Sequence, residues 1–146
     1  MQTKLLMIVS AALLLGGCMG PVRQAQTQQL TAAEIQSLFS DKTVESVSRS
    51  GNTTSFTYYH PDGRVLQQRL WSLRSGHWKV TDDAKICLSF AKTRCRAIQV
   101  DDGTYYKVKQ SKGKPAEKVV RYRRFAEGNH LLPAGQAWPE LAHFRP

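Results

Sequence analysis

The sequence lacks the short motifs that identify many enzymes. It has no GxSxG, no phosphate-binding glycine loop and no CxxCH haem-attachment motif, each of which would place reactive chemistry at a defined position. Histidine is scarce as well: four residues are scattered, and none stands at an interpretable spacing from a serine, cysteine or carboxylate. We therefore expect a protein that is not an enzyme, and we name no catalytic residue.

Cysteine is also scarce, which restricts metal chemistry. The chain has three cysteines, no CxxC pair, and no histidine near Cys87 or Cys95 at ligand spacing. Structural zinc sites need four such ligands at close spacing. We therefore expect neither a metal site nor a cofactor.

Acidic residues are few, with 11 Asp and Glu against 21 Lys and Arg, so the net charge is +10. This excess of positive charge predicts that the protein contacts anionic molecules, and it says nothing about the fold.

No hydrophobic run is long enough for a membrane span. The apolar segment 5–15 follows Lys4 and is far shorter than the ~20 residues that a spanning helix needs. A basic start, an apolar stretch and small residues before a cleavage point are typical of a signal peptide. We predict a signal peptide over residues 1–17, and a plain secretory signal would also fit this pattern.

The stretch Leu15-Gly16-Gly17-Cys18 resembles the lipobox of bacterial lipoproteins, although that family prefers Ala or Ser where Gly16 stands. The resemblance implies cleavage before Cys18 and acylation of Cys18, for example with palmitate. In enterobacterial lipoproteins, an Asp directly after the acylated cysteine retains the protein in the inner membrane. This chain has Met19 at that position. The implied location is therefore the outer membrane, facing the periplasm, with the inner membrane as the alternative under a looser sorting rule.

The remaining cysteines form an even pair in an exported chain, which predicts a disulfide between Cys87 and Cys95. Their spacing puts them opposite each other on a hairpin centred on Ala91, with residue 88 opposite 94 and residue 89 opposite 93. The expected Cα separation is about 5.5 Å. A redox switch is the alternative, and it would need an accessible, activated thiolate.

Three parts follow the signal peptide. Residues 18–29 are polar, which predicts a flexible tether. We predict a single β domain over residues 30–130 and an irregular tail over residues 131–146. Removing residues 1–17 leaves 129 residues with a net charge of +9, which is enough for one domain with a core.

The domain begins with a short helix and continues with strands. Thr31 and Glu34 form a capping-box pattern, and Leu30 and Ile35 are placed as a hydrophobic staple. From Thr43 the apolar period becomes two, with turn residues between the segments. The predicted strands are 43–49, 54–60, 64–70, 77–81, 85–90, 95–100, 104–109 and 118–125. We predict a mainly β fold, an antiparallel meander of about eight short strands that is barrel-like or a sandwich.

Positive charge is concentrated in residues 104–125, which carry eight basic residues and one acidic residue. If the apolar positions of the two strands in this segment are buried, Lys107, Lys109, Arg121 and Arg123 share one outer face. We predict that this face binds anionic lipid, lipopolysaccharide or wall polymer, and a merely solvated face is the alternative. The exported location argues against nucleic acid.

Part of the chain resembles a group of small exported proteobacterial proteins of uncharacterised function. The resemblance rests on Leu30-Thr31, Pro61-Asp62-Gly63, Gly76-x-Trp78-x-Val80, Cys87-Leu88 and Arg94-Cys95. It implies a β-rich exported domain with paired cysteines and no catalytic residues. Gly76-x-Trp78 also matches the GxW motif of lipocalins, but it stands on the wrong strand, and we interpret Trp78 and Val80 as core residues.

Together these features predict a lipid-anchored envelope protein that acts as a binding or structural module, with an envelope protein as a further possible partner. One alternative is a small-ligand carrier, which requires an interior cavity of about 300 Å³ or more. Another is an enzyme inhibitor that acts through the loop 110–117.

Overall fold

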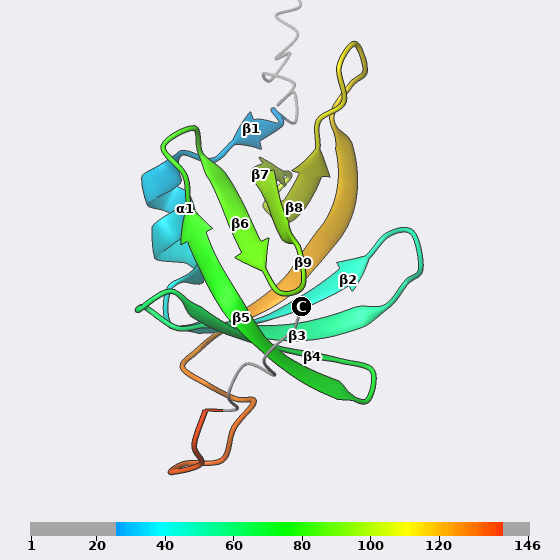
Figure 1. Cartoon of the computed structure of the whole chain (residues 1–146). Helices are drawn as coiled ribbons and strands as arrows, with labels where there is room; N and C mark the ends of the chain where they lie inside the picture. The colour runs from blue at the N-terminus through cyan, green and yellow to red at the C-terminus, as the bar shows by residue number, and fades with distance from the viewer. Residues whose placement is uncertain (1–25, 139–146) are drawn as a thin grey trace, which may run out of the picture.

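The computed structural model describes residues 26–138, in which nine β-strands and one α-helix follow each other along the chain (Figure 1). The predicted signal peptide, Cys18 and the end of the tail lie outside the described residues. The elements are β1 (Gln28–Gln29), α1 (Ala32–Phe39), β2 (Lys42–Ser48), β3 (Thr54–Tyr59), β4 (Arg64–Arg69), β5 (Ser72–Val80), β6 (Lys85–Ser89), β7 (Thr93–Asp101), β8 (Thr104–Lys109) and β9 (Glu117–Glu127).

The strands β2 to β9 close into an antiparallel barrel. The order along the sheet is β7-β6-β5-β4-β3-β2-β9-β8, and β8 pairs back with β7. The predicted meander of about eight strands is therefore confirmed, and its form is a closed barrel and not a sandwich. The short β1 is an addition: Gln28 and Gln29, which were assigned to the tether, pair with the last residues of β7.

Helix α1 begins where the sequence predicts. The hydroxyl of Thr31 accepts a hydrogen bond from the Glu34 N–H at 3.3 Å, and the Glu34 carboxylate accepts one from the Thr31 N–H at 2.7 Å. Both bonds satisfy N–H groups that a helix leaves unpaired at its start. Among the described residues no helix is long and apolar enough to cross a membrane.

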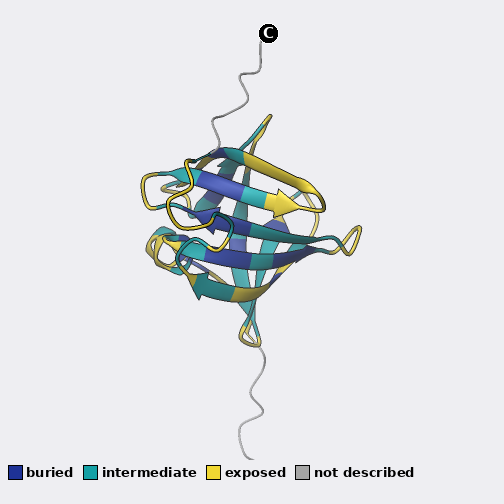
Figure 2. Ribbon diagram, turned by 90° about the horizontal axis from the view of Figure 1, so that it is seen from below, coloured by how far each residue is buried: buried dark blue, intermediate teal, exposed yellow. Residues whose placement is uncertain are grey.

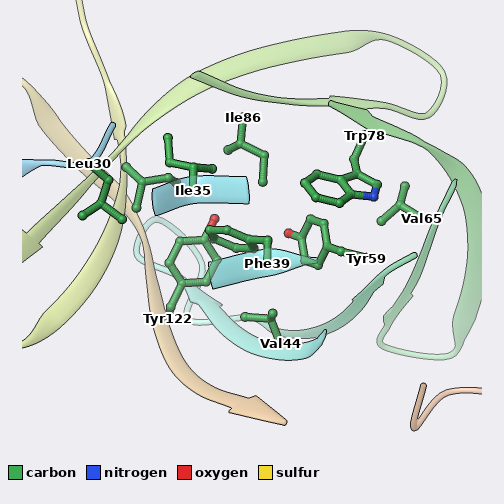
Figure 3. Close-up of a cluster of buried hydrophobic side chains, with 10 residues drawn as sticks. Leu30, Ile35, Phe39, Val44, Tyr59, Val65, Trp78, Ile86 and Tyr122 are labelled. Atoms are coloured by element: carbon green, nitrogen blue, oxygen red, sulfur yellow. The ribbon is translucent and has the colours of Figure 1, made fainter. Parts of the chain in front are cut away.

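The core fills one half of the barrel interior. Ile35 and Phe39 of α1 are fully buried, and Figure 3 shows Phe39 between the rings of Tyr59 and Tyr122. The ring centroids lie 5.0 and 5.2 Å from that of Phe39, in edge-to-face contact, a favoured geometry for aromatic pairs. The buried cluster comprises Leu30, Ile35, Phe39, Val44, Tyr59, Val65, Trp78, Ile86, Ile98 and Tyr122.

The two ends of the barrel differ. In an up-and-down meander, alternate hairpins lie at the same end. The core cluster and α1 lie at the end that holds the β3–β4, β5–β6 and β7–β8 turns, here called the closed end. The other four connections, residues 49–53, 70–71, 90–92 and 110–116, form the mouth. Figure 2 shows the buried residues along the strands and the exposed ones mostly in the loops.

One predicted turn is wrong. The turn expected between the predicted strands 64–70 and 77–81, at Ser75-Gly76, is not formed. Both residues lie inside β5, and the chain turns instead at Leu70-Trp71, between the paired residues Arg69 and Ser72. Gly76 faces the interior, where an added Cβ would collide with the Ser89 carbonyl oxygen and lie 2.8 Å from the Phe90 ring. The glycine therefore allows close packing of β5 against the end of β6 and does not reverse the chain.

The predicted disulfide is confirmed. Cys87 and Cys95 are directly opposed on β6 and β7, with 88 opposite 94 and 89 opposite 93. Their Cα atoms lie 4.0 Å apart, closer than the expected 5.5 Å. Because Cys87 is paired across the sheet with the outward-facing Lys79, the bond lies on the outer side of the barrel wall.

Candidate functional site

The mouth half of the barrel contains a cavity of about 890 Å³. It exists because α1 fills only the other half, and because the inward positions of β2 and β3 at this end carry small side chains. These are Ser46, Ser48, Ser55 and Thr57. A volume of this size lies within the range of about 300–1,000 Å³ typical of small-molecule sites.

The cavity is strongly cationic. No Asp or Glu is among its lining residues, and among residues 26–138 no carboxylate lies within 4.0 Å of its cations. The cations come from strands β4, β5, β7 and β8 and from the β6–β7 loop. They are Arg69, Arg74, Lys92, Arg94, Arg96, Lys107 and Lys109, here called the cavity cations. Like charges that converge without counter-charges repel each other and favour an anion between them.

Arg74 is held in place by its neighbours. Its guanidinium lies 4.1 Å from the centroid of the Phe90 ring, and its Nε donates to the Gln67 side-chain oxygen at 3.0 Å. Gln67 in turn donates to the hydroxyl of Thr57 at 3.0 Å. Partial burial, and then the charges of Arg69 and Arg94, lower the pKa of Arg74 below its usual range. This cation is therefore oriented before any ligand arrives.

Lys107 lies deeper in the cavity. On β8 it is paired with Ile98 on one side and with Val120 on the other, both of which face the interior. Its Nζ lies 6.0 Å from the centroid of the Tyr122 ring. Loss of hydration on burial, and then the charge of Arg96, lower the pKa of Lys107 to about 8. Lys107 is thus a partly desolvated cation with an incomplete set of partners.

Two tyrosines form the floor of the cavity, because Tyr59 and Tyr122 belong both to the core cluster and to the cavity lining. The hydroxyl of Tyr122 is buried and has no hydrogen-bond partner among the described residues. Burial raises the pKa of Tyr122 well above its usual value, so the hydroxyl stays protonated as a potential donor. Apolar surface from Leu88, Phe90 and Val120 completes the wall.

The predicted basic face is not formed, and the structure divides its four residues between the two sides of the barrel wall. Lys107 is opposite the inward-facing Val120, and both Lys107 and Lys109 line the cavity. Arg121 is opposite Tyr106 on the outer side, and Arg123 lies 3.6 Å from the carboxylate of Glu45. The common outer face predicted for these residues is therefore wrong.

The reason is the choice between two adjacent aromatics. A common outer face for Lys107 and Lys109 requires the alternating residues Tyr106 and Val108 to face inward. The structure instead places Tyr105 inside, paired with Val100 and 5.6 Å from the Phe125 ring. Since strand side chains alternate, a shift of one residue moves every side chain to the opposite face. The sequence does contain a signal for the cavity in the alternation Arg94-x-Arg96 and Lys107-x-Lys109.

The other predicted site residues lie elsewhere. The Cys87–Cys95 disulfide is outside the cavity, and Cys18 lies outside the described residues. No histidine or carboxylate lines the cavity, and no cluster of three or more His, Cys, Asp or Glu forms a potential metal site in residues 26–138.

By its fold and site the molecule is a closed antiparallel β-barrel with one end plugged by a helix and a basic cavity at the other. The chain belongs to the family described as "Protein of unknown function (DUF995)", whose model matches residues 5–127 and so includes every strand of the barrel. Neither a curated protein nor a solved structure matches the chain significantly.

Proposed function

We propose that this protein binds a small anionic ligand with an apolar part in the cavity of its barrel. The observation that carries the proposal is the cavity of about 890 Å³ lined by seven cations and no acid. Among the functions that the sequence predicts, this is the small-ligand carrier, and its condition of a cavity above about 300 Å³ is met.

The residues that line the cavity account for both properties of the proposed ligand, its negative charge and its apolar part. Arg74, Arg96 and Lys107 come from three strands and present guanidinium and ammonium donors, which form strong hydrogen bonds with carboxylate, sulfonate or phosphate groups. Leu88, Phe90 and Val120 offer apolar surface beside them. A carboxylate, sulfonate or phosphate ester with a short hydrocarbon or aromatic part satisfies both.

Binding, and not catalysis, fits the polar groups of the site. General bases in enzymes are most often histidines or carboxylates, and an activated nucleophile commonly needs such a base beside it to accept its proton. The lining residues contain no carboxylate and no histidine. In this proposal the cavity cations hold the ligand, and they take part in no reaction.

The location of the protein in the cell is part of the same proposal. The lipobox-like stretch ending at Cys18 supports attachment to the periplasmic side of the outer membrane by acyl chains. The Cys87–Cys95 disulfide is consistent with an oxidising compartment. The barrel would then bind its ligand in the cell envelope.

The test is binding of an anionic apolar fluorophore, anilinonaphthalene sulfonate, to a chain that begins at Met19 and so keeps every described element. Lys107→Met removes a cation from the cavity, and Arg121→Met removes one from the outer wall of the adjacent strand. A hydrogen bond to a charged group contributes about 1.5–3 kcal/mol. We therefore expect Lys107→Met to weaken binding about 10- to 100-fold and Arg121→Met to leave it unchanged. Equal affinities for the two variants would refute the proposal.

A further inference from the structure

The tip of the β4–β5 hairpin exposes large apolar side chains to water. Leu70 is 68% exposed, Trp71 100% and Leu73 42%, and these are the large hydrophobic residues exposed in the described part of the chain. We call them the apolar tip. Fully exposed Trp71 contributes nothing to the core, so folding does not explain its presence.

The backbone at this tip is strained as well. Leu70 and Trp71 are the whole loop between the paired residues Arg69 and Ser72, and Leu70 has a φ of 53°. Two-residue hairpin loops with a positive φ favour Gly, Asn or Asp, because a side chain such as Leu is disfavoured there. The turn thus holds two large apolar residues where small or polar ones would be more stable in water.

The apolar tip shares the mouth of the barrel with a group of cations. The four loops of the mouth contain Arg49, Lys92, Lys112 and Lys114, all exposed, and no acidic residue. Lys109 and Arg69 lie just below the loops at the ends of their strands and are also exposed, and one exposed acid, Glu117, lies at the same level, as the partner of Lys109. An aromatic and aliphatic tip at the same end of the barrel as these cations complements a membrane surface with anionic headgroups. Trp is favoured at the headgroup level, and each Lys or Arg near such a surface contributes about 1 kcal/mol.

We propose that the mouth of the barrel docks on an anionic lipid surface, with Leu70, Trp71 and Leu73 inserted among the headgroups. The mouth loops then lie against the lipid, and the closed end points away from it. This surface goes beyond the binding of a ligand in the cavity and does not require the cavity to be occupied.

The test uses the depth of tryptophan in the bilayer, because the full chain has three tryptophans in three different places. Trp71 is at the tip. Trp78 is 4% exposed in the core. Trp138 lies against Tyr58 and His60, and His60 begins the β3–β4 turn at the closed end. A quencher carried by the lipid therefore distinguishes contact through the mouth from contact through another part of the molecule.

The full chain is reconstituted in vesicles of phosphatidylglycerol and phosphatidylcholine with bromine on the upper part of the acyl chains. We expect the wild-type fluorescence to be partly quenched, the quenching to remain in Trp138→Phe, and to be lost in Trp71→Phe. Because an acyl anchor would attach every variant equally, the quenching reports the orientation of the barrel and not attachment as such.

The charge requirement is tested by a pair of variants with the same net charge. Lys112→Glu with Lys114→Glu reverses two cations of the mouth, whereas Lys79→Glu with Arg121→Glu reverses two exposed cations of the outer wall. We expect the first pair to reduce the quenching of Trp71 at least twofold and the second pair to leave it unchanged. Vesicles of phosphatidylcholine alone should give the same reduction for the wild type.

Two results would overturn the proposal. One is quenching that is absent from the wild type or that persists in Trp71→Phe. The other is a blue-shifted Trp71 emission without lipid that returns to the wavelength of exposed tryptophan on dilution, which would assign the apolar tip to contact with a second copy of the chain. Neither result would affect binding in the cavity, which has its own test.

Discussion

Lys107 is a cavity cation whose pKa lies close to neutral pH. Burial and the charge of Arg96 lower its pKa from the usual 10.5 to about 8. At pH 7 it is therefore mostly charged, and as the pH rises through about 8 it becomes neutral while it would still be charged in an unfolded chain. An anion in the cavity stabilises the charged form, so anion binding and proton binding at Lys107 favour each other.

We predict that the affinity for anilinonaphthalene sulfonate falls as the pH is raised from 7 to 9. Near pH 8, calorimetry in buffers of different ionisation enthalpy should show a fraction of a proton taken up on binding. In Lys107→Met the affinity should be lower throughout and nearly constant over this range. A wild-type affinity that does not change between pH 7 and 9 contradicts the role of Lys107.

For single residues, the alternation of basic and apolar residues in the sequence indicates a strand with two different faces. It does not indicate which face lies inside the barrel. The basic residues of β8 and β9 alternate with apolar ones, and the pattern Tyr105-Tyr106 allows two orientations of β8. The choice is made by packing, since Tyr105 contacts the core through Phe125. The alternating basic residues of β7 and β8 indicate a basic face on each strand, but they do not show that the two faces lie in one cavity. Arg74, Arg96 and Lys107 line the same cavity only through the register of the closed barrel.

Among the elements, β5 shows how a glycine can mislead. Its Gly76 is paired with Val65 and faces the inside, against the end of β6. The turn that precedes β5 contains no Gly, Asn, Asp or Pro, so no turn signal marks it. Other elements carry local signals. The capping box of Thr31 and Glu34 predicts the helix start, and Pro61-Asp62-Gly63 predicts the turn after β3. The cysteine pair predicts the hairpin of β6 and β7.

We predict that Gly76→Ala destabilises the barrel, because the new methyl group would collide with the backbone of β6, which cannot move without disturbing the sheet. Overpacking of this kind costs about 1–3 kcal/mol, and contact with backbone favours the upper part of that range. The measurement is urea unfolding, with Ser75→Ala in the neighbouring position as the control, expected within about 0.5 kcal/mol of the wild type. If the two variants are equally stable, the close approach at Gly76 has no energetic importance.

For the molecule as a whole, the proposed attachment to the membrane depends on Cys18. We predict that Cys18→Ser yields a chain that is unprocessed or soluble, whereas the double variant Cys87→Ser, Cys95→Ser keeps the acyl chains because it leaves the lipobox intact. The measurement is the intact mass together with partition into detergent. One acyl chain binds a membrane only marginally, so stable attachment requires two or three. A Cys18→Ser protein that has the processed mass and still enters detergent would contradict lipidation.

The two ends of the barrel carry opposite charges in their connections. The loops of the mouth hold only cations, whereas the connections at the closed end hold Asp41, Asp62, Asp82, Asp83 and Asp102 and no Lys or Arg. Arg64 and Lys85 at the adjacent strand starts form ion pairs with two of these aspartates, Asp62 and Asp83. The remaining difference between the ends gives the molecule an electric dipole directed along the barrel in addition to its positive net charge. Near an anionic surface the field would exert a torque that turns the mouth forward before contact. This steering acts over about 10 Å at 0.1 M salt and over only about 3 Å at 1 M, so ionic strength would govern how often an encounter begins in the correct orientation.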